Sequence, residues 1–306
     1  MKFPNLLSSS KRWKSATAAL RAEMAESRII AAQAAIRQIA AAGVLPKLAD
    51  AELRVFSQFG DDGILQYLIR LLDVQTTSFV EFGVENYTEA NTRFLLINNN
   101  WRGLIFDANE GYMDSVRRDS IYWRHDLTAV AAFIDRDNIN GLIANNGFRG
   151  DLGILSIDID GNDYWVWERI DAVQPTIVIA EYNSVFGGNR AVTIPYDPSF
   201  YRTSAHYSNL FWGCSLKALC VLAARKGYAF VGCNSAGNNA YFVRQDRLGP
   251  LQSLSAEQGY VESRFRESRD VDGKLTFLAG AARKQAIAHL EVVDVESGKT
   301  VTVGSL

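Results

Sequence analysis

The stretch LGILSIDIDGNDYWVWE, residues 152–168, joins an apolar run to a cluster of acids and then to a helix-forming segment. Its first part, Leu152 to Asp158, is short, apolar and β-branched, which is typical of a strand buried on both faces of a parallel sheet. Asp158, Asp160 and Asp163 then fall within six positions. The stretch therefore predicts a strand that presents acids at its carboxyl end and is followed by a crossover helix.

The same pattern recurs along the chain. Further strands are expected at FVEFGV (Phe79 to Val84), GLIFDA (Gly103 to Ala108), SIYW (Ser120 to Trp123) and TIVIAEY (Thr176 to Tyr182), with helix-length segments between them. A later pair, Tyr228 to Cys233 and Ala240 to Arg244, flanks the turn NSAGNN and indicates an antiparallel hairpin that closes the sheet. The pattern predicts a doubly wound α/β fold with a mostly parallel sheet.

One long helix is expected from Ser15 to Ala42, because the segment lacks Pro and Gly, and Gly43 and Pro46 then stop it. Small and apolar residues recur along it at spacings of three and four. Two interpretations stay open: this seam packs on the chain's own domain, or it forms a homo-oligomer interface. The members of the seam are Ala18, Ala22, Ala25, Ile29, Ala32, Ile36 and Ile39.

Three regions follow from this organisation. Residues 1–50 are a helical extension, residues 51–248 are the α/β domain, and residues 249–306 are a C-terminal extension. The last is expected to hold a helix near Leu278 to Ala288 and a hairpin that turns at Ser297-Gly298.

Composition narrows the classes of partner. The 306 residues carry a formal net charge of −2 and no sustained Lys/Arg run, so nucleic acid is not an expected partner. No apolar run approaches the roughly 20 residues of a membrane span, and the N-terminus lacks the apolar core of a signal peptide. Three cysteines without metal-site pairing fit reduced thiols, and a cytoplasmic location is expected.

Ligands bind open α/β sheets beyond the carboxyl ends of the strands, so polar residues at strand ends are the candidates for a site. Each of the five strands brings at least one such residue. They are Glu81, Asp107, His125, Asp126, Asp158, Asp160, Glu181 and Asn183.

The first two strand ends favour an adenosyl cofactor. An acid that closes the second strand, Asp107, is suited to accept hydrogen bonds from ribose hydroxyls, and Gly83 lets a ligand approach the first turn. The full G-x-G-x-x-G fingerprint of a dinucleotide site is absent, so no pyrophosphate cradle is evident. An adenosyl group without phosphates needs none.

Several separated motifs, in order, resemble class I S-adenosylmethionine-dependent methyltransferases, most closely the FkbM-like group. The resemblance covers Val55 to Arg244 and implies a Rossmann-like methyltransferase sheet. The motifs are FSQFGDDGIL, VEFGVENYTEANT, GLIFDAN, SIDIDGNDYWVWE, IAEYN and VGCNSAGNNAYFVR.

The resemblance implies roles for the strand-end residues. Glu81 and Gly83 would face the methionine part of S-adenosylmethionine, Asp107 the ribose, and His125 with Asp126 the adenine edge.

It also implies that the segment with Gln58 and Asp61 folds over the donor. The chain departs from the family's pattern in the first turn, where Glu85-Asn86-Tyr87 replaces a second small residue.

Two kinds of chemistry are open at the fourth and fifth strand ends. Carboxylates packed closely repel one another unless a proton or a cation is shared. A divalent cation such as Mg²⁺ on Asp160, Glu181 and Asn183 would assist deprotonation of a hydroxyl. Alternatively, Asp158, Asp160 or His206 takes the hydroxyl proton without a metal. Structural readings remain beside these: an internal salt bridge for Asp158 and Asp160, and helix capping for Asn162 and Asp163.

The acceptor is expected to be a carbohydrate. The long loop from Ser184 to Trp212 is loaded with aromatic residues, whose flat faces suit sugar rings, although any one of them can equally pack in the core. The leading hypothesis is an S-adenosylmethionine-dependent O-methyltransferase that acts on a sugar hydroxyl, in biosynthesis of a bacterial polysaccharide or related glycan.

Two alternatives compete with it. Asp158-Ile159-Asp160 is a D-x-D motif, which would suit a metal-dependent glycosyltransferase, and a methyltransferase fold without catalysis would suit an assembly module joined through the N-terminal helix.

Overall fold

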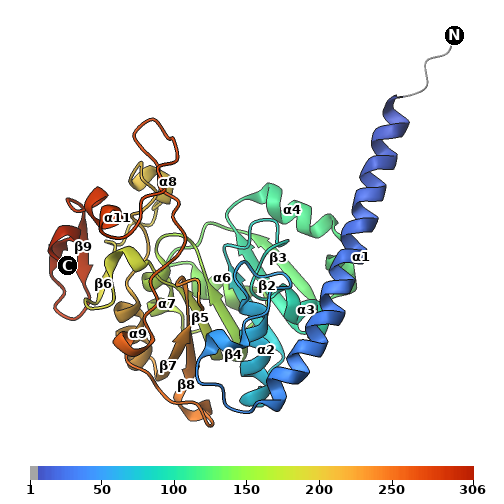
Figure 1. Cartoon of the computed structure of the whole chain (residues 1–306), viewed down its shortest axis with the longest axis horizontal. Coiled ribbons are helices and arrows are strands. Elements are labelled where there is room, and N and C mark those ends of the chain that lie inside the picture. The colour runs from blue at the N-terminus through green and yellow to red at the C-terminus, as the bar shows by residue number, and fades with distance from the viewer. Residues whose placement is uncertain (1–5) are drawn as a thin grey trace.

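The protein is built around a seven-stranded sheet in the order β3-β2-β1-β4-β5-β8-β7 (Figure 1). The computed structural model describes the backbone of residues 6–306, and the side chains of Leu20 and residues 23–306. All neighbouring strands are parallel except β8, which pairs antiparallel with both β5 and β7. The strands are β1 (Ser78–Phe82), β2 (Arg102–Asp107), β3 (Leu127–Ala131), β4 (Gly150–Ile157), β5 (Val173–Glu181), β7 (Tyr228–Cys233) and β8 (Asn239–Arg244). This confirms the predicted α/β fold with its antiparallel closing hairpin.

Helices cover both faces of the sheet. Successive strand residues point to opposite faces, so Phe79 and Ile105 pack against one set of helices while Val80 and Leu104 pack against the other. On the first face lie α2 (Asp61–Leu71), α3 (Arg93–Asn99), α4 (Glu110–Arg118) and α5 (Ser120–Arg124). On the second lie α6 (Ile139–Asn145), α7 (Asp163–Arg169) and α9 (Leu216–Arg225).

The third strand differs from the expectation. Ser120 to Trp123 forms the helix α5, because the Asp119 carboxylate accepts a hydrogen bond from the Ile121 backbone N–H and starts a helical turn. The strand comes later, at Leu127–Ala131. A strand pattern of four residues is too short to be told from a helix by periodicity alone.

The N-terminal helix α1 (Leu6–Ala41) packs on the body through its C-terminal half and extends away from it toward the N-terminus (Figure 1). Ala32 and Ile36 are buried against Val55 and Phe94. Packing on the chain's own domain therefore holds for this half of the seam. Ala18 and Ala22 lie outside the described side chains, and self-association stays a prediction.

The C-terminal residues form a small second sheet. Strands β9 (Glu291–Asp294) and β10 (Thr300–Thr302) make the predicted hairpin, and β6 (Val192–Thr193) from the long loop pairs antiparallel with β9. The short helices α8 (Arg202–Ala205), α10 (Ala256–Gly259) and α11 (Ala281–Ala286) lie in the loop and the C-terminal extension. The extension is thus tied to the α/β domain through the loop after β5.

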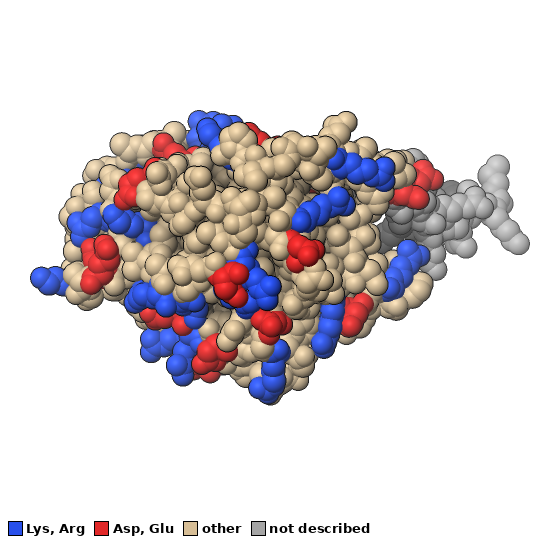
Figure 2. Space-filling view, turned by 90° about the horizontal axis from the view of Figure 1, so that it is seen from below, with Lys and Arg blue, Asp and Glu red and all other residues tan. Residues whose placement is uncertain are grey.

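Acidic and basic side chains are interspersed over the face in Figure 2, and neither sign forms a continuous patch there. Within residues 6–306 no helix has both the length and the apolar character that crossing a bilayer requires. The cytoplasmic location stays a prediction.

Candidate active site

A cleft of about 1040 Å³ opens at the carboxyl edge of the parallel strands. Its floor is made by residues that end β1, β2, β4 and β5, and one wall is made by the long loop and the C-terminal extension. The cleft therefore lies where an open α/β sheet is expected to bind its ligand.

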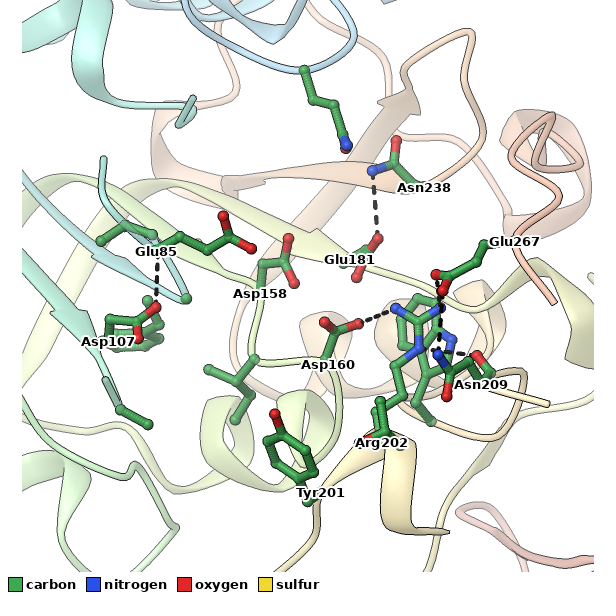
Figure 3. Close-up of a pocket in the computed structure, with 18 of the residues that line it drawn as sticks. Glu85, Asp107, Asp158, Asp160, Glu181, Tyr201, Arg202, Asn209, Asn238 and Glu267 are labelled. Carbon is green, nitrogen blue, oxygen red and sulfur yellow. Dashed lines mark hydrogen bonds and ion pairs between the residues drawn. The ribbon is translucent and has the colours of Figure 1, made fainter. Parts of the chain in front are cut away.

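Three carboxylates meet on the floor of this cleft. Asp158, Asp160 and Glu181 each place an oxygen within 4.8 Å of the others, and Figure 3 shows their side chains directed toward a common space. They come together because β4 and β5 are paired neighbours, so that the residues after Ile157 stand beside Glu181. The predicted meeting of the fourth and fifth strand ends is therefore present.

The charges of this cluster are incompletely balanced. Burial, followed by repulsion from Asp160, raises the pKa of Asp158 well above its usual range. Burial and repulsion from Asp158 likewise raise the pKa of Glu181. Arg202 brings a positive charge to the group, because its Nη1 lies 2.6 Å from Asp160 Oδ1. A shared proton or an additional cation would relieve the remaining repulsion.

Asp163 is part of the turn, not of the cluster. Its carboxylate accepts hydrogen bonds from the backbone N–H groups of Ile159 and Gly161, both at 2.9 Å. It occupies the first position of α7, and burial raises its pKa to about 6. Asp163, expected as a helix cap, thus stabilises the turn that precedes α7. In this turn Asp160 adopts a left-handed conformation with φ of 53°.

Glu81 is buried and holds the segment before α3. Its carboxylate accepts hydrogen bonds from the Asn91 and Thr92 N–H groups at 2.9 and 3.1 Å and from the Thr92 hydroxyl. Burial raises its pKa to about 7 despite these bonds. Glu81 therefore shapes the cleft wall, and a direct contact with a methionine moiety stays a prediction.

Asp107 ends β2 on the opposite side of the cleft from Arg202 (Figure 3). Its two oxygens accept hydrogen bonds from the N–H groups of Glu85 and Asn109, both at 2.8 Å. These bonds fix the carboxylate at the cleft while leaving lone pairs for a ligand. Asp107 thus lines the cleft, and its contact with a ribose stays a prediction.

His125 and Asp126 do not reach the cleft, which corrects the expected adenine contact. They precede β3, and the Asp126 carbonyl accepts the Gly103 N–H at the start of β2. Because β3 is five residues long, these residues lie roughly 16 Å from its carboxyl end. Ala132, Phe133 and Ile134 line the cleft instead. The error follows from placing the third strand too early.

The predicted segment with Gln58 and Asp61 leads into α2, and its two residues have different roles. Gln58 is exposed and lines the cleft, so its contact with a donor stays a prediction. Asp61 is completely buried and accepts hydrogen bonds from Asn234, Asn239 and the Tyr241 hydroxyl, which ties α2 to the closing hairpin. The contacts of Asp61 make it structural.

Asn183 is committed to the backbone of the long loop. Its amide nitrogen donates to the carbonyls of Leu210 and Trp212, and its oxygen accepts the Val185 N–H at 3.0 Å. These contacts argue against the predicted metal role of Asn183. The side chain that stands beside Asp160 and Glu181 is that of Asp158.

His206 does not line the cleft. Its Nδ1 lies 2.7 Å from the Ser208 hydroxyl oxygen, and its ring lies against Tyr207 and His289. The predicted role of His206 as a proton acceptor has no support in this geometry.

The cleft wall made by the long loop and the C-terminal extension, together with the turn of the closing hairpin, carries residues that the strand-end pattern did not predict. Asn238 of the closing hairpin donates to Glu181 at 3.5 Å, and Arg202 lies between Asp160 and Glu267 (Figure 3). Arg269 and Arg283 also line this wall. The motif VGCNSAGNNAYFVR held a signal for Asn238, whereas nothing local marks the residues of the C-terminal extension.

The aromatic residues of the long loop divide into two groups. Phe200, Tyr201, Tyr207 and Trp212 line the cleft. Phe186 and Phe211 pack in the core below the second sheet, and Tyr196 makes an edge-to-face contact with Trp165. Both interpretations of these residues therefore apply, each to a part of the set.

The sequence matches no protein-family model and no curated protein. Weak similarity exists to solved structures. The pyocyanin biosynthetic protein PhzM is 18% identical over 59% of this chain and 54% of that one, with a TM-score of 0.35. An O-methyltransferase from Bacillus cereus in complex with SAH is 13% identical, over 69% and 88%, with a TM-score of 0.37. The N-terminal domain of EvdMO1 with SAH bound is 9% identical, over 60% and 79%, with a TM-score of 0.38.

Proposed function

We propose that the protein is an S-adenosylmethionine-dependent O-methyltransferase that methylates a sugar hydroxyl, of the FkbM-like kind that its motifs resemble. The observation that carries the proposal is the cleft at the carboxyl edge, with Asp107 at the end of β2 on one side and the acids of β4 and β5 on the other. A donor and an acceptor can thus meet across the sheet edge.

Asp107 would bind the ribose of the donor, and the first turn would lie along its methionine part. The turn carries no further glycine after Gly83, and Glu85 and Tyr87 hold left-handed conformations there. Methyl transfer is a direct displacement: the acceptor oxygen forms a bond to the methyl carbon as the carbon–sulfur bond breaks. The protein supplies position and a proton acceptor.

Asp158 and Glu181 would receive the proton of the acceptor hydroxyl. Burial, followed by repulsion from the neighbouring acids, raises the pKa of both above the usual carboxyl range, which brings them closer to the range in which a general base works.

The three carboxylates also fit a hard divalent cation, whose preferred ligands are carboxylate oxygens. Bound there, Mg²⁺ would lower the pKa of the hydroxyl to be methylated.

The aromatic residues of the long loop that line the cleft support a carbohydrate acceptor. Tyr201 and Tyr207 are exposed on the loop and line the cleft, where their rings can stack on a sugar. We extend this to a glycan of a bacterial polysaccharide pathway by the family resemblance alone.

Calorimetric titration with S-adenosylhomocysteine tests the proposal. We expect the wild type to bind it and Asp107→Ala to bind about tenfold to a hundredfold more weakly, because charged hydrogen bonds to the ribose are lost. Asp114→Ala, on the outer surface of α4, is the matched control and should bind normally.

The same titration separates the two alternatives. Binding of UDP-glucose with Mg²⁺, without binding of S-adenosylhomocysteine, would favour the glycosyltransferase reading of Asp158-Ile159-Asp160. Binding of neither would favour an assembly module.

A further inference from the structure

Arg283 is a buried arginine whose guanidinium has no anionic partner among the described residues. The residue is 8% exposed and lines the cleft from α11. In the described part of the chain, its side chain makes no hydrogen bond and no ion pair, and its Nε is buried without a partner. Glu262 is exposed, and it attracts the Arg283 guanidinium only from beyond ion-pair distance.

The other two arginines of this wall are neutralised. Arg202 pairs with Asp160 at 2.6 Å and with Glu267 at 3.6 Å, and its Nε donates to the Asn209 carbonyl. Arg269 pairs with Glu267 at 3.2 Å and donates to the Gly273 carbonyl. Among the cleft arginines, Arg283 is therefore the one whose charge is left over in the described structure.

An unpaired buried charge is costly, and proteins seldom retain one without a compensating group. Burial lowers the pKa of Arg283, yet an arginine stays protonated at neutral pH. Arg202 lies close enough to add repulsion to this cost. A planar guanidinium of this kind matches a carboxylate or phosphate through two parallel hydrogen bonds.

We propose that Arg283 binds an oxyanion of the acceptor, so that the substrate is an acidic carbohydrate bearing a carboxylate or a phosphate. This inference rests on the proposed function for its acceptor. Arg283 lies near Arg202, which contacts Asp160, so the oxyanion would bind at the end of the cleft that holds the proton-accepting acids. Asp107, which would hold the donor, lies on the other side of these acids (Figure 3).

The arrangement also has an electrostatic reason. The floor of the cleft carries three acids, which would repel an anionic sugar. One free guanidinium offsets that repulsion at one point and so orients the sugar by its charged group.

Three probes test the proposal by calorimetric titration in the presence of S-adenosylhomocysteine: D-glucuronate, D-glucose 6-phosphate and D-glucose. We expect the wild type to bind at least one of the two acidic sugars about tenfold to a hundredfold more tightly than glucose. Which acidic sugar binds distinguishes a carboxylate from a phosphate.

Variants then assign the preference to Arg283. Arg283→Met keeps the apolar stem and should bind all three probes equally weakly, whereas Arg283→Lys keeps the charge and should retain part of the preference. Arg264→Met, on an exposed neighbouring segment, should behave as the wild type. Unfolding temperature and affinity for S-adenosylhomocysteine should be unchanged in Arg283→Lys, which guards against misfolding.

The proposal is overturned if the wild type shows no preference for either acidic sugar at millimolar concentration, or if the preference survives in Arg283→Met. Failure of the proposed function looks different. In that case S-adenosylhomocysteine does not bind. The preference of the wild type for acidic sugars, and the loss of this preference in Arg283→Met, can still be measured by titration without S-adenosylhomocysteine.

Discussion

Gly83 lies so close to the end of β4 that a Cβ atom on it would stand 1.7 Å from the carbonyl oxygen of Asp158. Its φ of +71° is also a conformation that favours glycine. The turn after β1 and the acids after β4 are therefore packed backbone to backbone. Glycine is needed here for contact within the protein, in addition to any approach by a ligand.

Gly83→Ala should destabilise the protein and disturb the cleft. We expect the free energy of unfolding to fall by roughly 3 kcal/mol, because the new methyl group both overpacks and strains the turn. Gly227→Ala is the control: φ is +80° there, but nothing lies within 4 Å of the added Cβ. It should cost about 1 kcal/mol. Equal losses in denaturant titrations of the two variants would contradict the proposed clash.

Glu81 should make stability depend on pH. Its pKa is raised from 4.5 to about 7 by burial, so the folded state binds a proton more readily than the unfolded state. The resulting stabilisation is fully present below about pH 4.5 and is lost as pH rises through about 7, for a total of roughly 3 kcal/mol.

Glu81→Gln removes this titration. The difference in unfolding free energy between wild type and variant should therefore change in favour of the wild type as pH falls from about 8 to about 5. A difference that stays constant over this range would show that Glu81 keeps an ordinary pKa.

Asp158→Asn should weaken binding of Mg²⁺. The three carboxylates form the candidate ligand set. Loss of a residue that only hydrogen-bonds a metal ligand lowers metal affinity by roughly tenfold or more, so loss of a ligand itself should lower the affinity for Mg²⁺ at least as much. Asp151→Asn is the matched control, because Asp151 lies at the opposite end of the same strand, β4. If wild type and both variants bind Mg²⁺ alike in calorimetry, the metal proposal fails.

Asp62→Ala should loosen the segment that carries Gln58. The Asp62 carboxylate accepts hydrogen bonds from the N–H groups of Val55, Phe56 and Ser57 at 2.7 to 2.8 Å, and from the Ser57 hydroxyl. We expect a loss of about 3 kcal/mol in unfolding free energy and weaker binding of S-adenosylhomocysteine. Asp171→Ala, an exposed acid, should change neither, and a variant of Asp62 that binds normally would exclude a role for this segment.

The sequence by itself determined most of the sheet. Apolar runs such as Thr176 to Tyr182 and Tyr228 to Cys233 specify strands because burial on both faces is a local property of composition. It also brought Asp107, Asp158 and Glu181 to one edge, since parallel strands end on the same side. It failed at β3, where the capping contact of Asp119 outweighed a weak strand pattern.

Only the tertiary structure decided which residues form the cleft wall that faces the strand ends. Arg202, Glu267 and Arg283 come from a loop and an extension whose positions depend on the pairing of β6 with β9. Pairing between segments this far apart in the chain leaves no periodic signal. Whether a charged side chain finds a partner is likewise decided by packing in three dimensions. For that reason, only the folded protein shows that Arg283 has no anionic partner among the described residues.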